Sequence, residues 1–193
     1  MVLILVPTAL ESDLLFPNGS PGRIALCGFG LANAGAGAAQ AIAANPSAAS
    51  DGVVLVGAAG TYDPDRHPVG SAVIAGRIRC VGIGAGAGAA HRSAAELGFA
   101  DSDVIELGDG AELLSVAAAA GSPAEAGERR AGHPGAAGEE MEGYAVAVAA
   151  RLCGVGLTIV RGFSNVAGER DRSRWRMRDA LDRAAGLVLE AVG

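Results

Sequence analysis

The sequence predicts an α/β domain with a mostly parallel, twisted sheet and helices on both sides. Short apolar runs over residues 2–6, 52–58 and 157–162 are continuous, as in strands covered on both faces. Segments of helical composition alternate with these runs, which is typical of parallel sheets. The 193 residues suit a single domain, 1–193, with a sizeable core, and no internal repeat divides them.

Apolar runs and breakers define the elements of the first half. We expect a strand over Val2–Val6 stopped by Pro7, a strand over Arg23–Gly28, a helix over Ala34–Ala44 ended by Asn45-Pro46, a strand over Gly52–Ala58 and a polar loop over Thr61–Gly70.

The second half continues the alternation. We expect short strands in Val73–Val81, helices over Ala89–Leu97 and Glu125–Arg130, a buried apolar helix over Glu142–Cys153, a strand over Leu157–Gly162 and an amphipathic helix over Ser173–Val192 with Ser173 as N-cap. Segment 117–138 is rich in Ala, Gly and Pro, a composition that permits mobility.

Composition excludes several kinds of function. Half of the chain is hydrophobic but only 4% is aromatic, so small side chains let elements pack closely. All 15 basic residues are arginine, which excludes a Schiff-base lysine and a P-loop lysine. The net charge of −6 argues against nucleic acid as a partner. The amino-terminal apolar run is too short to span a membrane and lacks a basic leader, so a cytoplasmic protein is expected.

The cysteines and histidines indicate neither a disulfide framework nor a metal site. Cys27, Cys80 and Cys153 are isolated, and we expect buried, reduced thiols. The histidines at 67, 91 and 133 lie in unrelated polar loops without metal-ligand spacing. No metal or cofactor is therefore expected.

Two glycine-rich segments resemble fragments of a dinucleotide-binding fingerprint. Gly28-Phe-Gly30 has Asn33 where the third glycine belongs, and the run 82–88 lacks the acid that should follow it. Chance matches are expected with 30 glycines, so a nicotinamide site is disfavoured. Gly57–Gly60 is instead a place where the backbone approaches a sugar or base closely.

Parallel sheets bind ligands at the carboxyl ends of their strands, and several acidic residues lie at the ends of predicted strands or helices. Glu11 follows the first strand and suits a general base that activates water, although a solvated loop acid is the alternative. Glu139 and Glu140 suit an exposed helix start. Glu142 directly precedes an apolar run, so its carboxylate needs buried partners such as two vicinal ribose hydroxyls, with Met141 beneath the sugar.

Asn165 follows a buried strand and Ser164. Its amide NH₂ can donate to O6 and N7 of a 6-oxopurine, whereas an aspartate would suit the amino group of adenine. A simple turn residue is the alternative. Residues 171–175 are expected to form a helix cap with exposed charges and a packed indole.

The run Glu140-Met-Glu-Gly143 followed by VRGFSN resembles the nucleoside phosphorylase/nucleosidase superfamily. The likeness extends to ALESD, GFGLANAGAGAA and VLVGAAG, and the tail from Ser164 to Trp175 looks most like that of the futalosine hydrolases. It implies a three-layer α/β/α fold with a mixed, mostly parallel sheet. It also implies hydrolysis of futalosine to hypoxanthine and dehypoxanthinyl futalosine, in menaquinone synthesis.

The resemblance also implies roles for individual residues. Glu11 and Asn165 would be catalytic, Glu142 and Met141 would hold the ribose, and the remaining substrate contacts would come from Gly60, Phe163 and Ser164. Phe163 is the nearest aromatic candidate for stacking on the purine, and arginines within 170–178 are candidates for binding a carboxylate on the 5′ substituent.

The expected partner is a small-molecule nucleoside, bound by a homodimer or higher homo-oligomer in which loop 61–70 reaches an adjoining pocket. A hydrolase is favoured over a phosphorylase, because phosphorylases of the superfamily that the chain resembles need cationic groups to bind phosphate. Here the first strand is followed by the acidic segment ALESD, and no arginine occurs before Arg23. A methylthioadenosine/S-adenosylhomocysteine nucleosidase, a purine nucleoside phosphorylase and a non-catalytic nucleoside-binding domain are the alternatives.

Overall fold

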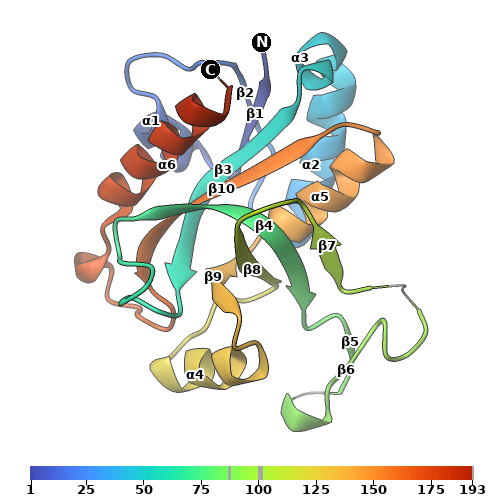
Figure 1. Cartoon of the computed structure of the whole chain (residues 1–193), viewed down its shortest axis with the longest axis vertical. Helices are drawn as coiled ribbons and strands as arrows, with labels where there is room; N and C mark the ends of the chain where they lie inside the picture. Colours follow the sequence, from blue (N-terminus) through green and yellow to red (C-terminus); the bar gives the residue numbers. More distant parts are fainter. Residues whose placement is uncertain (87, 100–101, 193) are drawn as a thin grey trace.

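The computed structural model describes residues 1–86, 88–99 and 102–192 and is built on a mixed β-sheet (Figure 1). The strands are β1 (Leu3–Val6), β2 (Arg23–Leu26), β3 (Val53–Thr61), β4 (Ala72–Val81), β5 (Gly84–Ala85), β6 (Arg92–Ser93), β7 (Val104–Glu106), β8 (Ala111–Val116), β9 (Ala136–Glu140) and β10 (Leu157–Val166). The helices are α1 (Ala9–Leu15), α2 (Gly30–Ala44), α3 (Pro46–Ser50), α4 (Pro123–Gly132), α5 (Gly143–Leu152) and α6 (Met177–Val192).

The sheet is parallel at one end and closes on itself at the other. Its order is β10-β4-β8-β9-β3-β1-β2, and β3 pairs with β10 as well, so β3, β10, β4, β8 and β9 form a ring. β2, β1, β3 and β10 are parallel to one another, while β10–β4, β3–β9 and β4–β7 are antiparallel. The predicted mixed, mostly parallel sheet is confirmed.

Helices cover both faces of the parallel part of the sheet, which confirms the three-layer architecture (Figure 1). Alternate residues of β1 point to opposite faces. Leu3 and Leu5 pack in the core cluster formed with α2 and α5. Ile4 and Val6 pack in the cluster formed with α1 and α6. The continuous apolar runs in the sequence therefore reflect strands that are buried on both sides.

Small residues bring the helices unusually close to the strands. A Cβ atom added at Gly162 of β10 would collide with the backbone carbonyl of Ala180 in α6. A Cβ at Gly37 of α2 would likewise collide with the carbonyl oxygen of Cys27. The glycine and alanine content is thus a packing requirement of the layers.

Several predicted elements differ in the structure. Residues 89–97, predicted to be helical, form part of a 3₁₀ turn (Gly88–Ala90), strand β6 and turns, because the segment has no apolar stripe to bury. Ser173 does not cap the last helix. Asp171 caps a 3₁₀ turn over Arg172–Arg174, and α6 begins only at Met177.

The helix predicted over Glu125–Arg130 is confirmed as α4, which lies in segment 117–138, whose composition permits mobility. Strands β7, β8 and β9 and helices α1 and α3 were not predicted from the sequence, and residue 87 of the glycine run 82–88 lies outside the described residues. Cys27 and Cys80 are buried free thiols as predicted, but Cys153 is exposed at the end of α5. None of the described helices combines the length and the apolar character needed to cross a membrane.

Candidate active site

A cavity of about 280 Å³ lies at the carboxyl ends of the central strands. Glu11 after β1, Glu142 after β9 and Asn165 in β10 all line it, although they are far apart in the chain. The same cavity is also lined by Gly60 of β3, Met141 and Ser164. The expected convergence of the three polar side chains is therefore present.

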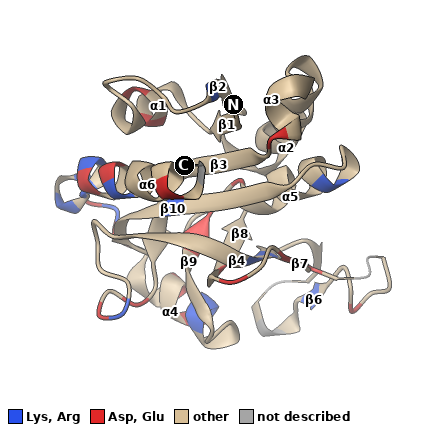
Figure 2. Ribbon diagram, turned by 45° about the horizontal axis from the view of Figure 1, so that its top comes forward, with Lys and Arg blue, Asp and Glu red and all other residues tan. Residues whose placement is uncertain are grey.

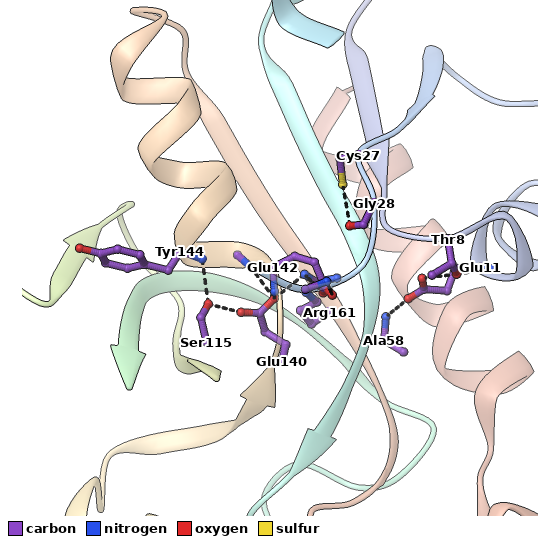
Figure 3. Close-up of polar contacts among 12 residues, drawn as sticks. Thr8, Glu11, Cys27, Gly28, Ala58, Ser115, Glu140, Glu142, Tyr144 and Arg161 are labelled. Carbon is purple, nitrogen blue, oxygen red and sulfur yellow. Dashed lines mark hydrogen bonds and ion pairs between the residues drawn. The ribbon is translucent and has the colours of Figure 1, made fainter. Parts of the chain in front are cut away.

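Glu11 is held rigidly in the first turn of α1. The hydroxyl of Thr8 donates to its Oε2 at 2.6 Å, and the backbone N–H of Ala58 donates to its Oε1 at 2.9 Å (Figure 3). Thr8 is also the N-cap of α1, accepting from the backbone N–H of Glu11. With 9% of its surface exposed, Glu11 presents an oriented carboxylate to the cavity.

Glu142 is the residue before α5, and its carboxylate joins two parts of the fold. Its Oε1 accepts from the backbone N–H of Gly30 at 3.0 Å, and its Oε2 accepts from the guanidinium of Arg161 at 3.1 Å. Burial raises its pKa to about 7, with the carboxylates of Glu140 and Glu11 adding to the rise while Arg161 and the Gly30 N–H oppose it. Glu142 thus gains or loses a proton near neutral pH.

The Gly28-Phe-Gly30 turn therefore has a different role from the one its pattern suggests. It places the amino terminus of α2 against a carboxylate of the same chain, where a dinucleotide-binding turn would face a phosphate. Within the described ranges, no cluster of three or more His, Cys, Asp or Glu side chains is arranged to hold a metal ion.

Arg161 and Glu140 form a buried ion pair beneath the site. Arg161 is 0% exposed and donates to both Glu140 and Glu142 (Figure 3). Glu140 also accepts from the Ser115 hydroxyl and from the backbone N–H groups of Glu142, at 3.0 Å, and Gly143, at 2.7 Å. Burial disfavours the charged guanidinium, but these carboxylates outweigh it, so the pKa of Arg161 is raised.

Sequence reasoning missed this buried ion pair. The prediction that Glu139 and Glu140 lie exposed at a helix start is wrong, since both belong to β9 and are only 4% exposed. Arg161 stands in the middle of an apolar strand, and a buried arginine needs acidic partners. That signal in the sequence VRGF could have led to Glu140.

Gly57 lets Glu11 and Arg161 approach each other. A Cβ atom at this position would lie 2.8 Å from Oε1 of Glu11 and would also collide with Nη1 of Arg161. Both polar atoms therefore face the same point of the β3 backbone. Nε and Nη1 of Arg161 are buried and have no hydrogen-bond partner within the described part of the chain.

Glu139 anchors the loop before α4 and the helix itself. It accepts from the Tyr62 hydroxyl at 2.7 Å and from the backbone N–H of Ala120 at 2.7 Å, and it pairs with Arg129 of α4. Burial and the neighbouring Glu139 carboxylate raise the pKa of Tyr62. These bonds fix the loop before α4, where Ala119 lines the cavity.

The amide of Asn165 is oriented by its neighbours in sequence. Its Nδ2 donates to the backbone carbonyl of Val166 at 2.8 Å, and its Oδ1 accepts from the Ser164 hydroxyl at 2.8 Å. Because an amide NH₂ has two hydrogens, one remains for a ligand. Asn165 is 7% exposed, so that hydrogen is available only inside the cavity.

The expectation that Phe163 stacks on a ligand is not met. Phe163 is fully buried, does not line the cavity, and has its ring centroid 5.7 Å from that of His67. The pairing of β10 with β3 is irregular between Phe163 and Asn165, and Phe163 packs in the core while Ser164 and Asn165 both line the cavity. Phe29 and Trp175 are the aromatic residues that line the cavity among the described residues.

The carboxyl-terminal part of the chain matches a known family. The model of the phosphorylase superfamily matches residues 117–193, which include Glu142 and Asn165. The match confirms the resemblance that the EMEG and SN motifs predict. No curated protein sequence matches the chain.

Solved structures share the fold over almost the whole chain. A 5′-methylthioadenosine/S-adenosylhomocysteine nucleosidase from Colwellia psychrerythraea in complex with adenine has a TM-score of 0.74 at 20% identity, covering 100% of this chain and 94% of that one. Futalosine hydrolase of Helicobacter pylori has a TM-score of 0.77 at 15% identity, covering 99% and 96%. An S-adenosylhomocysteine nucleosidase from Streptococcus pyogenes has a TM-score of 0.75 at 16% identity, covering 97% and 94%.

The two neighbouring acids should differ in their contribution to stability. We expect Glu140→Gln to lower the free energy of unfolding at pH 7 by about 3–5 kcal/mol, since it leaves Arg161 short of a buried charge. Glu142→Gln should cost about 1 kcal/mol, because Glu142 is already partly protonated near pH 7. Urea denaturation of both variants measures the difference, and an equal or larger loss for Glu142→Gln would contradict this assignment.

Proposed function

We propose that the protein is a nucleosidase that hydrolyses the N-glycosidic bond of a 6-oxopurine nucleoside. Futalosine is the preferred substrate, giving hypoxanthine and dehypoxanthinyl futalosine in cytoplasmic menaquinone biosynthesis. The observation that carries the proposal is the convergence of Glu11, Glu142 and Asn165 on one cavity. The shared fold with nucleosidases, futalosine hydrolase among them, supports it.

Each side chain has a part of the reaction that suits its position. Glu142, already bonded to Gly30 and Arg161, keeps lone pairs that accept the ribose hydroxyls. Met141 supplies apolar surface beside the sugar. Asn165 donates its free amide hydrogen to the purine at O6 or N7, where negative charge gathers as the bond breaks.

Glu11 is the general base of this mechanism. The electron pair of the C1′–N9 bond goes to the purine, a water oxygen bonds to C1′, and Glu11 takes a proton from that water. The departing purine anion takes its proton from solvent.

Hydrolysis is favoured over phosphorolysis by the charges around the sugar. The buried cation Arg161 is already neutralised by Glu140 and Glu142, and Glu11 adds another carboxylate beside it. An inorganic phosphate would meet repulsion there, whereas neutral water would not. An adenine-releasing nucleosidase is the second candidate, because such enzymes share the fold.

A nucleoside panel tests the proposal directly. We expect free hypoxanthine from futalosine, with little adenine from methylthioadenosine or S-adenosylhomocysteine, because Asn165 offers a donor at the purine edge. The rate should not depend on added phosphate. Chromatography of the released bases provides the measurement. Adenine as the main product would move the protein to the second candidate, and phosphate-dependent release would make it a phosphorylase.

Replacing the general base should impair chemistry more than binding. We expect Glu11→Gln to reduce kcat by about 10²–10⁴-fold with a small change in KM, because the amide keeps the shape but cannot take a proton. Asp13→Asn is the matched control, since Asp13 lies exposed on the same helix. Steady-state kinetics on futalosine decide the point, and near-normal kcat in Glu11→Gln removes its assigned role.

Substrate capture should depend on pH through Glu142. Only its carboxylate form accepts both ribose hydroxyls, and its pKa is raised to about 7. We therefore expect kcat/KM to rise about tenfold per pH unit below neutrality and to level off above it. Glu142→Gln should have a lower kcat/KM without this dependence. A wild-type profile that stays flat between pH 5 and 8 would contradict the proposal.

A further inference from the structure

The outer end of the cavity differs in chemistry from its buried end. Asn165 and Glu142 are 7% and 4% exposed and would hold the base and the ribose inside. Leu10 and Phe29, which line the same cavity, are 65% and 58% exposed and therefore lie toward its mouth. The 5′ side of a bound nucleoside would then extend toward the mouth.

Two arginines at this mouth pair with no acidic side chain in the described part of the chain. The segment between β10 and α6 carries charges of both signs, as does the amino-terminal end of α6 (Figure 2). Arg174 pairs with Glu169, and Arg176 pairs with Asp179. Arg170 and Arg172 line the cavity instead and form no ion pair or side-chain hydrogen bond with any described residue.

Local contacts hold Arg170 and Arg172 near the ring of Trp175. The indole N–H of Trp175 donates to the carbonyl of Glu169 at 3.2 Å, and the guanidinium carbon of Arg170 lies 5.5 Å from the Trp175 ring centroid. Asp171 caps the 3₁₀ turn that contains Arg172. The mouth thus offers a flat apolar surface together with two guanidinium groups that match a carboxylate in geometry.

We propose that the cavity mouth is a specificity subsite for an aromatic 5′ substituent bearing a carboxylate. Arg170 and Arg172 bind the carboxylate, and Trp175, Phe29 and Leu10 contact the aromatic ring. The inference rests on the proposed function, because it concerns the same substrate. Of the arginines within 170–178 that are candidates for binding the carboxylate, the proposal selects Arg170 and Arg172. A 5′-phosphate fits less well, since its strongly hydrated charge would sit against three apolar side chains.

A pair of synthetic inosine derivatives isolates the carboxylate. One carries a 3-carboxyphenylthio group at C5′ and the other an unsubstituted phenylthio group. We expect the wild type to prefer the acid by roughly 10–100-fold in kcat/KM, a range set by one or two charged hydrogen bonds at a partly exposed site. Added salt should shrink this preference.

Arginine variants then assign the preference to residues. The double variant Arg170→Ala/Arg172→Ala should lose roughly 10-fold or more in kcat/KM for the acid, mainly through KM, and change less than about threefold for the phenylthio probe. Arg178→Ala removes one exposed arginine from α6, outside the cavity lining, and is the control. It should leave both probes unaffected.

The outcomes separate the subsite from the proposed function. Equal wild-type rates on both probes would refute the subsite while leaving the nucleosidase standing. A double variant that loses both probes alike would indicate a structural role for the segment, and a preference for inosine 5′-phosphate over the acid would make the anion a phosphate. If no probe releases base, the proposed function fails, and calorimetric binding of the two probes still decides the subsite.

Discussion

The buried guanidinium of Arg161 is the interaction on which the rest of the site depends. A fully buried cation is tolerated only with close acidic partners, and Glu140 and Glu142 supply them. These partners lie at and just beyond the end of β9, which pairs with β3 and β8 but not with β10. The ion pairs therefore tie together strands on different sides of the ring, and the ring in turn holds the acids in place.

Glu140 and Glu142 are two residues apart but have different surroundings. Glu140 is bonded by a hydroxyl, a guanidinium and two backbone N–H groups, which leaves it little capacity for a ligand. Glu142 has one backbone donor and shares Arg161, so burial dominates and its pKa is raised to about 7. The same side chain type thus serves as a structural anchor at one position and as an open acceptor at the other.

The sequence predicts the parts of this arrangement that depend on local pattern. Apolar runs predict β1, β3 and β10, and the apolar run after Glu142 correctly predicts that this carboxylate is buried. The pattern fails for β9, because Ala-Ala-Gly-Glu-Glu has no alternation of large apolar residues. The side chains that bind its acids, Tyr62, Ser115 and Arg161, come from distant segments. Phe163 and Ser164 show the same limit, since only the strand register decides which of them faces the cavity.

Main-chain donors explain how a chain so rich in glycine and alanine can orient several carboxylates. The backbone N–H groups of Ala58, Gly30 and Ala120 each bind one acid: Glu11, Glu142 and Glu139. Such donors need no polar side chain, and their positions are fixed by the strands, helices and turns that contain them. Gly57 adds the space that lets Glu11 and Arg161 share one side of β3. The small residues are therefore part of the site's electrostatics, because larger ones would separate the charges that the backbone holds together.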